Sequence, residues 1–310
     1  MPLLAEFENV AASSTINIAL LTELKTTSSR ENYENVFYLQ AYRIAIVNWP
    51  NDFQPRKSLG QNFLLDENVL RKIVRAIDPK PEDHFVEIGP GMGALTKHLL
   101  EAGSHCLAVE IDQRLIPLLQ ERFAAYPNFK LLNQDFREVA LNGFAGEHKL
   151  RLVGNIPYHI TSHLVFTAFA QRALLRDMLL TVQREVAERI VATPGGKEYG
   201  ILSIMSQTFA HAELLFTISP HVFRPKPEVE SAVVRWQFQA PPLPIVDDDF
   251  YVAMVKAIFG QRRKTLRRSL SNFLNTETPL AFIDLQRRPE TLAIAELIQL
   301  ANGLAKTKDA

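Results

Sequence analysis

Cysteine and long hydrophobic runs are what this sequence most clearly lacks. Its 310 residues include a single cysteine, Cys106, which lies in an apolar stretch. One cysteine excludes a disulfide within the chain and any metal site built from several thiolates. A buried free thiol fits a reducing compartment, so we expect a cytoplasmic protein. No apolar run approaches the roughly 20 residues that a membrane-spanning helix needs, and we therefore expect no membrane partner.

An excess of charge of either sign is also missing, because 34 Lys and Arg residues balance 34 Asp and Glu residues. The distribution is less even, since residues 1–55 hold six acids and three bases, which leaves 31 bases and 28 acids in the rest of the chain. Clustering, rather than the total, decides whether a protein can bind nucleic acid. Residues 1–52 carry little hydrophobic pattern, no basic secretory start and no Arg-rich transit signal, so we treat them as an unassigned N-terminal extension.

From residue 57 onward, strand-forming and helix-forming segments alternate along the chain. Strands are expected at 84–89, 105–111, 129–135, 150–155 and 177–183, with helices between them. This alternation predicts an α/β fold with a parallel sheet that helices cover on both faces. Two more strands are expected at 212–219 and 231–238, and three prolines within residues 241–244 then indicate a linker. We therefore divide the chain into an α/β domain, 53–240, and a helical domain, 241–310.

A glycine-rich loop follows the first strand. The segment "VEIGPGMGALT" places Gly89, Gly91 and Gly93 between that strand and a helix, where glycine permits a tight turn and close approach of a ligand to the backbone. The spacing of Gly89, Gly91 and Ala94 also satisfies the dinucleotide-binding pattern G-x-G-x-x-A. The loop by itself therefore leaves a nicotinamide dinucleotide, another nucleoside cofactor and a purely structural turn open.

Acidic residues follow the next two strands. Glu110 ends the second strand, where a carboxylate can accept hydrogen bonds from both ribose hydroxyls of an adenosine. Asp135 ends the third strand, where a carboxylate can accept from an adenine amino group. Because the carboxyl ends of parallel strands share one edge, the loop and the acids predict a single cleft for an adenosine-bearing ligand. A positively charged sulfonium group tolerates this acidic rim better than a pyrophosphate would.

The fourth strand leads into "GNIPYHIT", residues 154–161. The side-chain oxygen of Asn155 and a backbone carbonyl held by the rigid Pro157 offer two acceptors aimed at one point, and Tyr158 offers a ring face. This set suits the exocyclic amine of a flat base, because accepting its N–H hydrogens lets the nitrogen attack and stabilises the developing positive charge. Stacking on the tyrosine ring, worth about 1–3 kcal/mol, would hold the base. This chemistry requires neither a metal nor a general base. The alternative interpretation of the segment is a plain turn that leaves a strand.

His159 and His163 could be proposed as zinc ligands. They lack the third ligand of a zinc site, so we expect no metal.

Seven segments taken in order resemble the ribosomal RNA adenine dimethyltransferase family: KSLGQNFL, VEIGPGMGALT, VEID, NQDF, GNIPYHIT, FRPKPEVESAVV and QRRKTLRRSL. The resemblance runs from about Arg56 to the C-terminus, whereas the first 50 or so residues have no counterpart. It implies a class I S-adenosylmethionine-dependent methyltransferase, with a Rossmann-like seven-stranded sheet and a small C-terminal helical domain. It also implies dimethylation of the N6 atoms of two adjacent adenosines near the 3′ end of small-subunit ribosomal RNA during ribosome biogenesis. S-adenosylhomocysteine would be the product, the immature small subunit the partner, and we expect a monomer.

The resemblance assigns residues to this reaction. It implies that Asn155, Pro157 and Tyr158 form the catalytic loop. Phe223 would be a second aromatic wall beside the target base, and its alternative role is that of a core residue at a strand end. The residues implied around the cofactor are Asn62, Leu64, Gly89, Gly91, Glu110, Asp135 and Asn155.

A basic cluster lies near the end of the chain, in "QRRKTLRRS", which carries five cations within seven residues. We expect one helical segment over residues 250–274, in which Arg263 and Arg267 are four residues apart, and like charges at that spacing repel by a few tenths of a kcal/mol. A solvated helix face usually mixes charge signs, so this single-sign face favours phosphate binding. Apolar residues 266, 270, 273 and 274 would form the opposite, buried stripe. The cations expected to bind RNA are Arg262, Arg263, Lys264, Arg267 and Arg268.

Three other functions compete with RNA methylation. An adenine-N6 DNA methyltransferase is disfavoured because Ile156 occupies a position that is usually proline in those enzymes. A non-catalytic nucleic-acid-binding or ribosome-assembly factor on the same fold is disfavoured by intact Asn155 and Tyr158. A nicotinamide oxidoreductase ranks last, because no acid/base pair for hydride transfer is evident.

Overall fold

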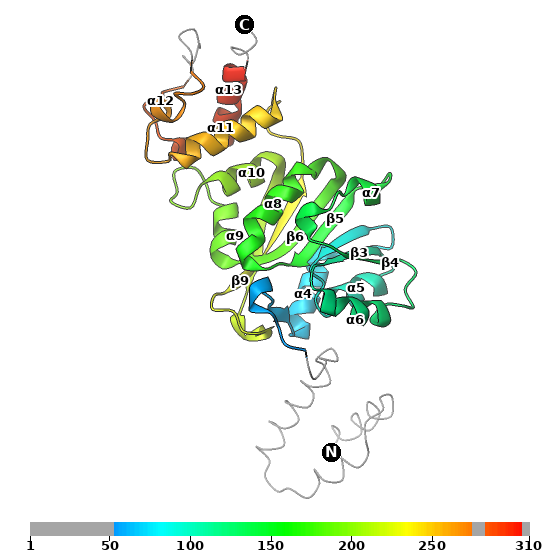
Figure 1. Ribbon diagram of the computed structural model, residues 1–310. Helices are drawn as coiled ribbons and strands as arrows, with labels where there is room; N and C mark the ends of the chain where they lie inside the picture. Colours follow the sequence, from blue (N-terminus) through cyan, green and yellow to red (C-terminus); the bar gives the residue numbers. More distant parts are fainter. Residues whose placement is uncertain (1–52, 275–282, 306–310) are drawn as a thin grey trace, which may run out of the picture. The chain divides into compact units, whose positions relative to one another are not determined.

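The computed structural model describes residues 53–274 and 283–305 of the chain (Figure 1). The expected N-terminal extension, residues 1–52, lies outside the described residues. The longest helix of the described part has 13 residues. No helix there combines the length and apolar character that crossing a membrane requires.

A seven-stranded sheet forms the centre of the α/β domain (Figure 1). Its strands lie in the order β4, β3, β2, β5, β6, β9, β7. The first five of these are mutually parallel, and β9 runs antiparallel to both β6 and β7. The strands are β2 (His84–Ile88), β3 (His105–Glu110), β4 (Phe129–Asn133), β5 (Leu150–Asn155), β6 (Leu175–Gln183), β7 (Ala210–Ile218) and β9 (Ser231–Phe238).

This topology confirms the predicted α/β fold and its seven strands. The chain leaves β2 toward β3 and β4 on one side and returns to β5 on the other, so the strand order reverses at β2. Ligands of such sheets bind outside the carboxyl ends of the strands at this reversal. The reversed direction of β9 was not part of the sequence-based prediction, because strand direction depends on how the connection before it crosses the sheet.

Helices connect the strands and extend beyond them. Helices α4 to α6 group near β3 and β4 in Figure 1, whereas α9 contacts β6 and β9, and α10 contacts β7. The helices are α4 (Glu67–Ile77), α5 (Ala94–Glu101), α6 (Ile116–Arg122), α7 (Asn142–Ala145), α8 (Thr161–Ala170), α9 (Arg184–Ile190), α10 (Ile201–Phe209), α11 (Asp248–Gly260), α12 (Leu266–Ser269) and α13 (Ile294–Ala305). Pro117 lies in the first turn of α6 and so delimits that helix, where its missing N–H costs nothing.

Buried side chains join the sheet to the C-terminal helices. One hydrophobic cluster includes Trp236 on β9, Tyr251 on α11 and Leu297 on α13, all fully buried. The polar atoms of this cluster are satisfied, since the Trp236 ring N–H donates to Ser206 Oγ at 3.0 Å and the Tyr251 hydroxyl lies 2.8 Å from Thr208 Oγ1. Helix α10 accordingly contacts both α11 and α13. The division at residue 240 remains a prediction.

A short second ladder ties the start of the described chain to the segment before β9. Strand β1 (Phe63–Leu64) pairs antiparallel with β8 (Phe223–Arg224), with Leu64 opposite Phe223. The Leu65 N–H extends this contact by donating to the Val222 carbonyl at 2.9 Å. Two-residue strands have no periodicity to detect, so the sequence did not reveal this pairing.

The prediction of a single helix through the basic cluster is wrong. Helix α11 ends at Gly260, and α12 begins only at Leu266. Gly260 has no Cβ and therefore a low helix propensity. The following residues, 261–264, form a turn that is closed by the Lys264 N–H, which donates to the Gln261 carbonyl at 2.8 Å. Arg263 and Arg267 are therefore not neighbours on one helix face. The predicted apolar stripe is nevertheless confirmed in part, because Leu266 and Leu270 are fully buried.

Candidate active site

The carboxyl ends of four neighbouring strands are tied together by hydrogen bonds. The Gly89 N–H, just past β2, donates to the Val109 carbonyl of β3 at 2.9 Å. The Asn133 side chain at the end of β4 donates to the Glu110 carbonyl at 2.8 Å. On the other side of β2, Ile88 is in register with Gly154, next to Asn155. The predicted convergence of the glycine loop and the strand-end side chains at one sheet edge is therefore present.

The glycines of the loop are required for two different reasons. Both Gly89 and Gly91 have positive φ, 62° and 58°, which L side chains rarely adopt. A Cβ on Gly91 would lie 2.9 Å from the Phe63 ring, so this glycine makes room for protein rather than for ligand. A Cβ on Gly89 would have no described atom within 4 Å. Gly89 is thus the loop position where the backbone faces open space.

Glu110 is a buried carboxylate that supports the glycine loop. Its side chain accepts from the Gly91 N–H at 3.2 Å and from the Asp112 N–H at 2.8 Å, and the residue is only 4% exposed. Burial raises the pKa of Glu110 to about 7, although the hydrogen bonds from these backbone N–H groups lower it in part. Each oxygen keeps a second lone pair, so the carboxylate can still accept from a ligand hydroxyl.

Asp135 is held by a neighbouring arginine. Its carboxylate accepts from the Arg137 backbone N–H at 2.9 Å and pairs with the Arg137 guanidinium. The hydrogen bond from that guanidinium is the main reason why the pKa of Asp135 lies below its usual range. The arginine was not anticipated from the sequence, and it keeps Asp135 ionised and directed along the short 3-10 helix Phe136–Glu138.

Asn155 and Asn62 are brought together from distant parts of the chain. The Asn155 side-chain nitrogen donates to the Asn62 backbone carbonyl at 2.7 Å. This bond fixes the amide so that its oxygen Oδ1 is the atom left to accept. Within residues 53–274 and 283–305, no protein donor reaches that oxygen. The Pro157 carbonyl accepts from the Ile160 N–H at 3.3 Å, which leaves the preceding carbonyl, that of Ile156, as the candidate second acceptor.

A cavity of about 280 Å³ opens beside this loop. The residues that line it are Gly60, Asn62, Tyr158, His159 and Gln183. The Tyr158 hydroxyl lies 2.5 Å from Ser231 Oγ, and Ser231 is fully buried at the start of β9. Burial, opposed by this hydrogen bond, raises the pKa of Tyr158. The ring is thereby anchored at its hydroxyl end while the residue contributes to the cavity wall.

Phe223 does not line this cavity. The residue is 4% exposed and sits in the β1–β8 ladder opposite Leu64. Its position matches the alternative role of a core residue at a strand end. A role as a stacking wall remains a prediction, and so does the cofactor contact expected of Leu64.

Four further residues at this edge were missed by sequence reasoning. Gln61 donates to the Asp112 carboxylate at 2.7 Å, and Arg114 holds the same carboxylate while donating to the Gln54 carbonyl at 3.0 Å. These bonds hold the segment before β1 against the end of β3. Gln183 ends β6, two residues past Thr181, which is in register with Asn155 on β5, so the strand-end rule that found Glu110 could have found it.

The basic cluster lies at the surface. Arg263, Lys264, Arg267 and Arg268 are all exposed, and none of them forms an ion pair within the described chain. Arg262 differs, because its guanidinium donates to the Gly196 carbonyl at 2.9 Å. Four of the five predicted RNA-binding cations are therefore available, and the fifth is engaged in a contact within the protein.

Taken together, a mostly parallel sheet with one reversed strand near its edge, a glycine loop and strand-end acids define the class I S-adenosylmethionine-dependent methyltransferase fold. Two solved structures have the same fold. A dimethyladenosine transferase from Plasmodium falciparum superposes with a TM-score of 0.65 at 24% identity, covering 77% of this chain and 97% of the other. The 23S rRNA methyltransferase ErmE superposes with a TM-score of 0.61 at 24% identity, covering 78% and 99%.

Sequence comparison is more specific than the fold. Residues 52–306 match the model of the ribosomal RNA adenine dimethylase family, and the chain belongs to that family. Similar curated proteins include the ribosomal RNA small subunit methyltransferase A of Marinobacter nauticus, 41% identical over 82% of this chain and 93% of that protein. The protein of the same name from Pseudomonas syringae pv. tomato is 44% identical over 81% of this chain and 95% of its own length. The resemblance found in the seven segments is confirmed.

Proposed function

We propose that this protein dimethylates the N6 atoms of two adjacent adenosines near the 3′ end of small-subunit ribosomal RNA. Family membership supports adenine dimethylation of ribosomal RNA. The relatives at 41% and 44% identity are small-subunit enzymes by name, which favours that subunit over the large one. The observation that carries the proposal is the Asn155–Asn62 hydrogen bond, because it leaves Asn155 Oδ1 as an acceptor and ties Asn155 to Asn62, which lines the 280 Å³ cavity.

We assign the cofactor site to the edge formed by β2, β3 and β4. The open space at Gly89 allows a ligand to approach the backbone, and Glu110 offers lone pairs for ribose hydroxyls. Asp135, kept ionised by Arg137, would accept from an adenine amino group. These residues fit S-adenosylmethionine, which when bound supplies an electrophilic methyl group on a sulfonium centre. Asn62 and Leu64 would border this site from the segment beside the catalytic loop.

In the proposed reaction, this chain positions and polarises the target amine. Asn155 Oδ1 and the Ile156 carbonyl, which the Pro157 ring holds in place, accept the two N–H hydrogens of the adenine amino group. The amine nitrogen would take the methyl group that S-adenosylmethionine supplies, leaving S-adenosylhomocysteine, and the two oxygens would stabilise the positive charge that develops on the nitrogen. The Tyr158 ring face stacks on the base, and Ser231 holds the tyrosine hydroxyl. The proton that the nitrogen loses passes to solvent.

We further propose that residues 241–310 form an RNA-binding domain, in which the exposed cations Arg263, Lys264, Arg267 and Arg268 contact phosphates. The enzyme is proposed to act as a cytoplasmic monomer on the immature small subunit.

Incubation with labelled S-adenosylmethionine and undermethylated small ribosomal subunits tests the function. The expected product is N6,N6-dimethyladenosine in small-subunit RNA, found by nucleoside analysis after digestion. Undermethylated large subunits serve as the matched substrate control and should take up no label. Label confined to the large subunit, or to monomethylated adenosine or another base, would contradict the proposal.

A further inference from the structure

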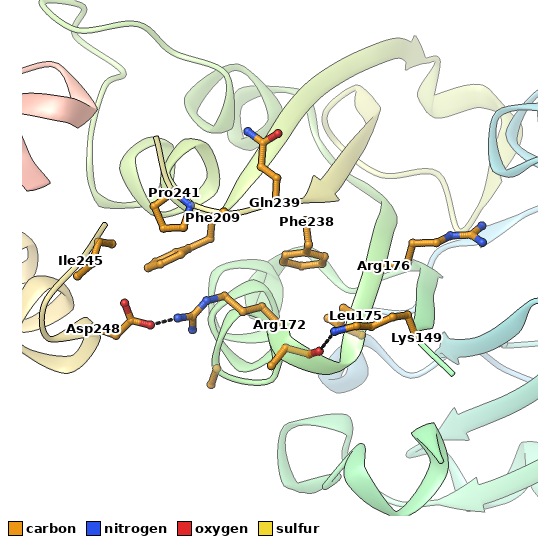
Figure 2. Close-up of a pocket in the computed structure, with 13 residues that line it drawn as sticks. Lys149, Arg172, Leu175, Arg176, Phe209, Phe238, Gln239, Pro241, Ile245 and Asp248 are labelled. Atoms are coloured by element: carbon orange, nitrogen blue, oxygen red, sulfur yellow. Dashed lines mark hydrogen bonds and ion pairs between the residues drawn. The ribbon is translucent and has the colours of Figure 1, made fainter. Parts of the chain in front are cut away.

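A second, larger cavity of about 620 Å³ lies at the opposite end of the sheet (Figure 2). Leu175 and Arg176, the first residues of β6, line it, whereas Gln183 at the other end of β6 lines the cavity beside the catalytic loop. Eight residue steps at about 3.3 Å each separate the two ends of this strand, a span of about 26 Å. The linker after β9 closes the cavity through Pro241 and Ile245.

Cations outnumber acids in the lining, with Lys149, Arg172 and Arg176 facing a single acid, Asp248. Arg172 is engaged within the protein, because it pairs with Asp248 and its guanidinium lies 4.1 Å from the centre of the Phe209 ring. Arg176 contacts Asp83 at 2.9 Å but is 51% exposed. It also lies 3.7 Å from the Asp177 carboxylate, so its charge is shared with two acids while about half of its side chain stays exposed.

Lys149 gives the cavity its unbalanced charge. Its ammonium group donates to the Ala173 carbonyl, which is neutral, and no carboxylate pairs with it in the described ranges (Figure 2). An ammonium group has three donors, so two remain for a ligand once the Ala173 carbonyl has taken one. The cavity therefore offers about one net positive charge, two free N–H donors from Lys149 and the half-exposed guanidinium of Arg176.

The other wall is aromatic and apolar. Figure 2 shows the rings of Phe209 and Phe238 along one side of the cavity, with Lys149 and Arg172 extending along the other. Phe238 is half-buried, and one edge-on contact with Phe169 at 5.7 Å supports it. A flat ring can stack on such a side chain while an attached anion reaches the cations.

We propose that this cavity binds one nucleotide of the RNA substrate, with its phosphate at Lys149 and Arg176 and its base against Phe238. A single net charge matches a phosphodiester, which carries one negative charge, better than a free monophosphate, which carries nearly two at neutral pH. The volume lies within the range of small-molecule sites, about 300–1,000 Å³. The inference that the nucleotide belongs to the RNA substrate rests on the proposed function. The inference that the ligand is a flat ring with an attached phosphate rests on the cavity alone. Because about 26 Å separate the two cavities, an RNA must extend well beyond the catalytic cavity to engage both.

Binding of undermethylated small subunits at several salt concentrations tests this proposal. Lys149→Ala should weaken affinity several-fold and reduce the slope of log Kd against log salt by about one, as expected for one lost phosphate contact. Lys149→Arg should restore both. Phe238→Leu should weaken affinity without changing the slope. Lys130→Ala is the matched control, because Lys130 is likewise exposed and without an ion pair in the described chain, but lies on β4 at the far edge of the sheet.

Two comparisons separate the outcomes. The single-turnover rate at saturating subunits should stay unchanged in Lys149→Ala, and a short oligonucleotide that fills only the catalytic cavity should bind this variant and the unmodified protein equally. Equal affinity and salt slope for Lys149→Ala and Lys130→Ala would overturn the proposal. Saturable binding of AMP, abolished by Lys149→Ala while subunit affinity is unchanged, would assign the site to a free nucleotide and overturn it as well. These binding measurements need no methyl transfer, so failure of the proposed reaction would be seen separately.

Discussion

The side-chain nitrogen of Asn155 donates a hydrogen bond of 2.7 Å to the backbone carbonyl of Asn62, 93 positions earlier in the chain. This bond decides which end of the amide is available for chemistry, because the oxygen is the atom that remains. It also links the strand-end loop to the segment that Gln61 fastens onto Asp112.

Replacing Asn155 should affect the chemical step more than binding of the RNA. Asn155→Ala removes an acceptor that matters most as charge develops, so the single-turnover rate of methyl transfer should fall by about 10²–10³. Some loss of cofactor affinity should accompany this, since Asn155 is also proposed to border the cofactor. Circular dichroism and thermal melting establish that the variant is folded. A near-normal rate in the folded variant would show that residues 154–161 form only a turn.

Tyr158 and Ser231 should act as a pair. Tyr158→Phe keeps the ring face but leaves the fully buried Ser231 hydroxyl without its 2.5 Å partner, which should cost about 1–3 kcal/mol of stability. The double variant Tyr158→Phe with Ser231→Ala removes both partners and should recover most of that loss. Methyl-transfer rates should remain close to normal in both variants and fall strongly in Tyr158→Ala. Denaturant unfolding of the single and double variants measures the coupling, and simple additivity would contradict it.

Cofactor binding should depend on pH through Glu110. Burial raises the pKa of this carboxyl to about 7 in the free protein, whereas accepting ribose hydroxyls favours its ionised form. Affinity for S-adenosylhomocysteine, measured by calorimetry, should therefore rise between pH 6 and pH 8 and then level off. Glu110→Gln should weaken binding at pH 8 and flatten the profile. A profile that is the same in both proteins would assign the pH dependence to another group.

The raised pKa of Glu110 should make the folded protein less stable as the pH rises, although cofactor affinity increases over the same range. The folded protein holds the Glu110 proton more tightly than the unfolded chain does, so this contribution is complete below about pH 4.5 and is lost as the pH rises through about 7. Glu87, whose pKa burial also raises to about 7, should behave likewise. Glu87→Gln should keep an acceptor for Thr96 and make the unfolding free energy less dependent on pH between 5 and 7.

Alanine at Gly89 and at Gly91 should give different defects despite similar backbone strain. Both positions have positive φ, so each substitution costs about 1–2 kcal/mol for that reason alone. Gly91→Ala also pushes a methyl group into the Phe63 ring and should lower stability further. Gly89→Ala meets no protein atom and should chiefly weaken cofactor binding. Unfolding and calorimetry on the two variants make the comparison, and a larger stability loss for Gly89→Ala would reverse the assignment.

The four exposed cations of the basic cluster should act through phosphate contacts. Changing Arg263, Lys264, Arg267 and Arg268 together to alanine should weaken RNA binding and reduce its salt slope, with cofactor affinity nearly unchanged. Arg262→Ala is the control within the same segment, because that side chain is already bonded to the Gly196 carbonyl. An unchanged salt slope in the fourfold variant would mean that the cluster is only a solvated surface.

The sequence by itself determined the strand and helix order, because hydrophobic periodicity and the residues that cap or break helices are local properties. It also placed Gly89, Glu110, Asp135 and Asn155 at the ends of strands, and the rule for parallel sheets then predicted that these residues share one edge. A cap is equally local, since Asp66 directly precedes α4 and accepts from the N–H groups of Asn68 and Val69.

Only the tertiary structure decided which atoms face one another. No local sequence pattern encodes the geometry of three contacts at the site. Asn155 donates to the Asn62 carbonyl, Arg137 pairs with Asp135, and the Phe63 ring fills the space at Gly91. The break after Gly260 was also missed, because the helical pattern continues through residues whose backbone N–H groups instead meet the carbonyls of Leu285 and Arg287. Local propensity is worth tenths of a kcal/mol per residue, so such long-range contacts override it.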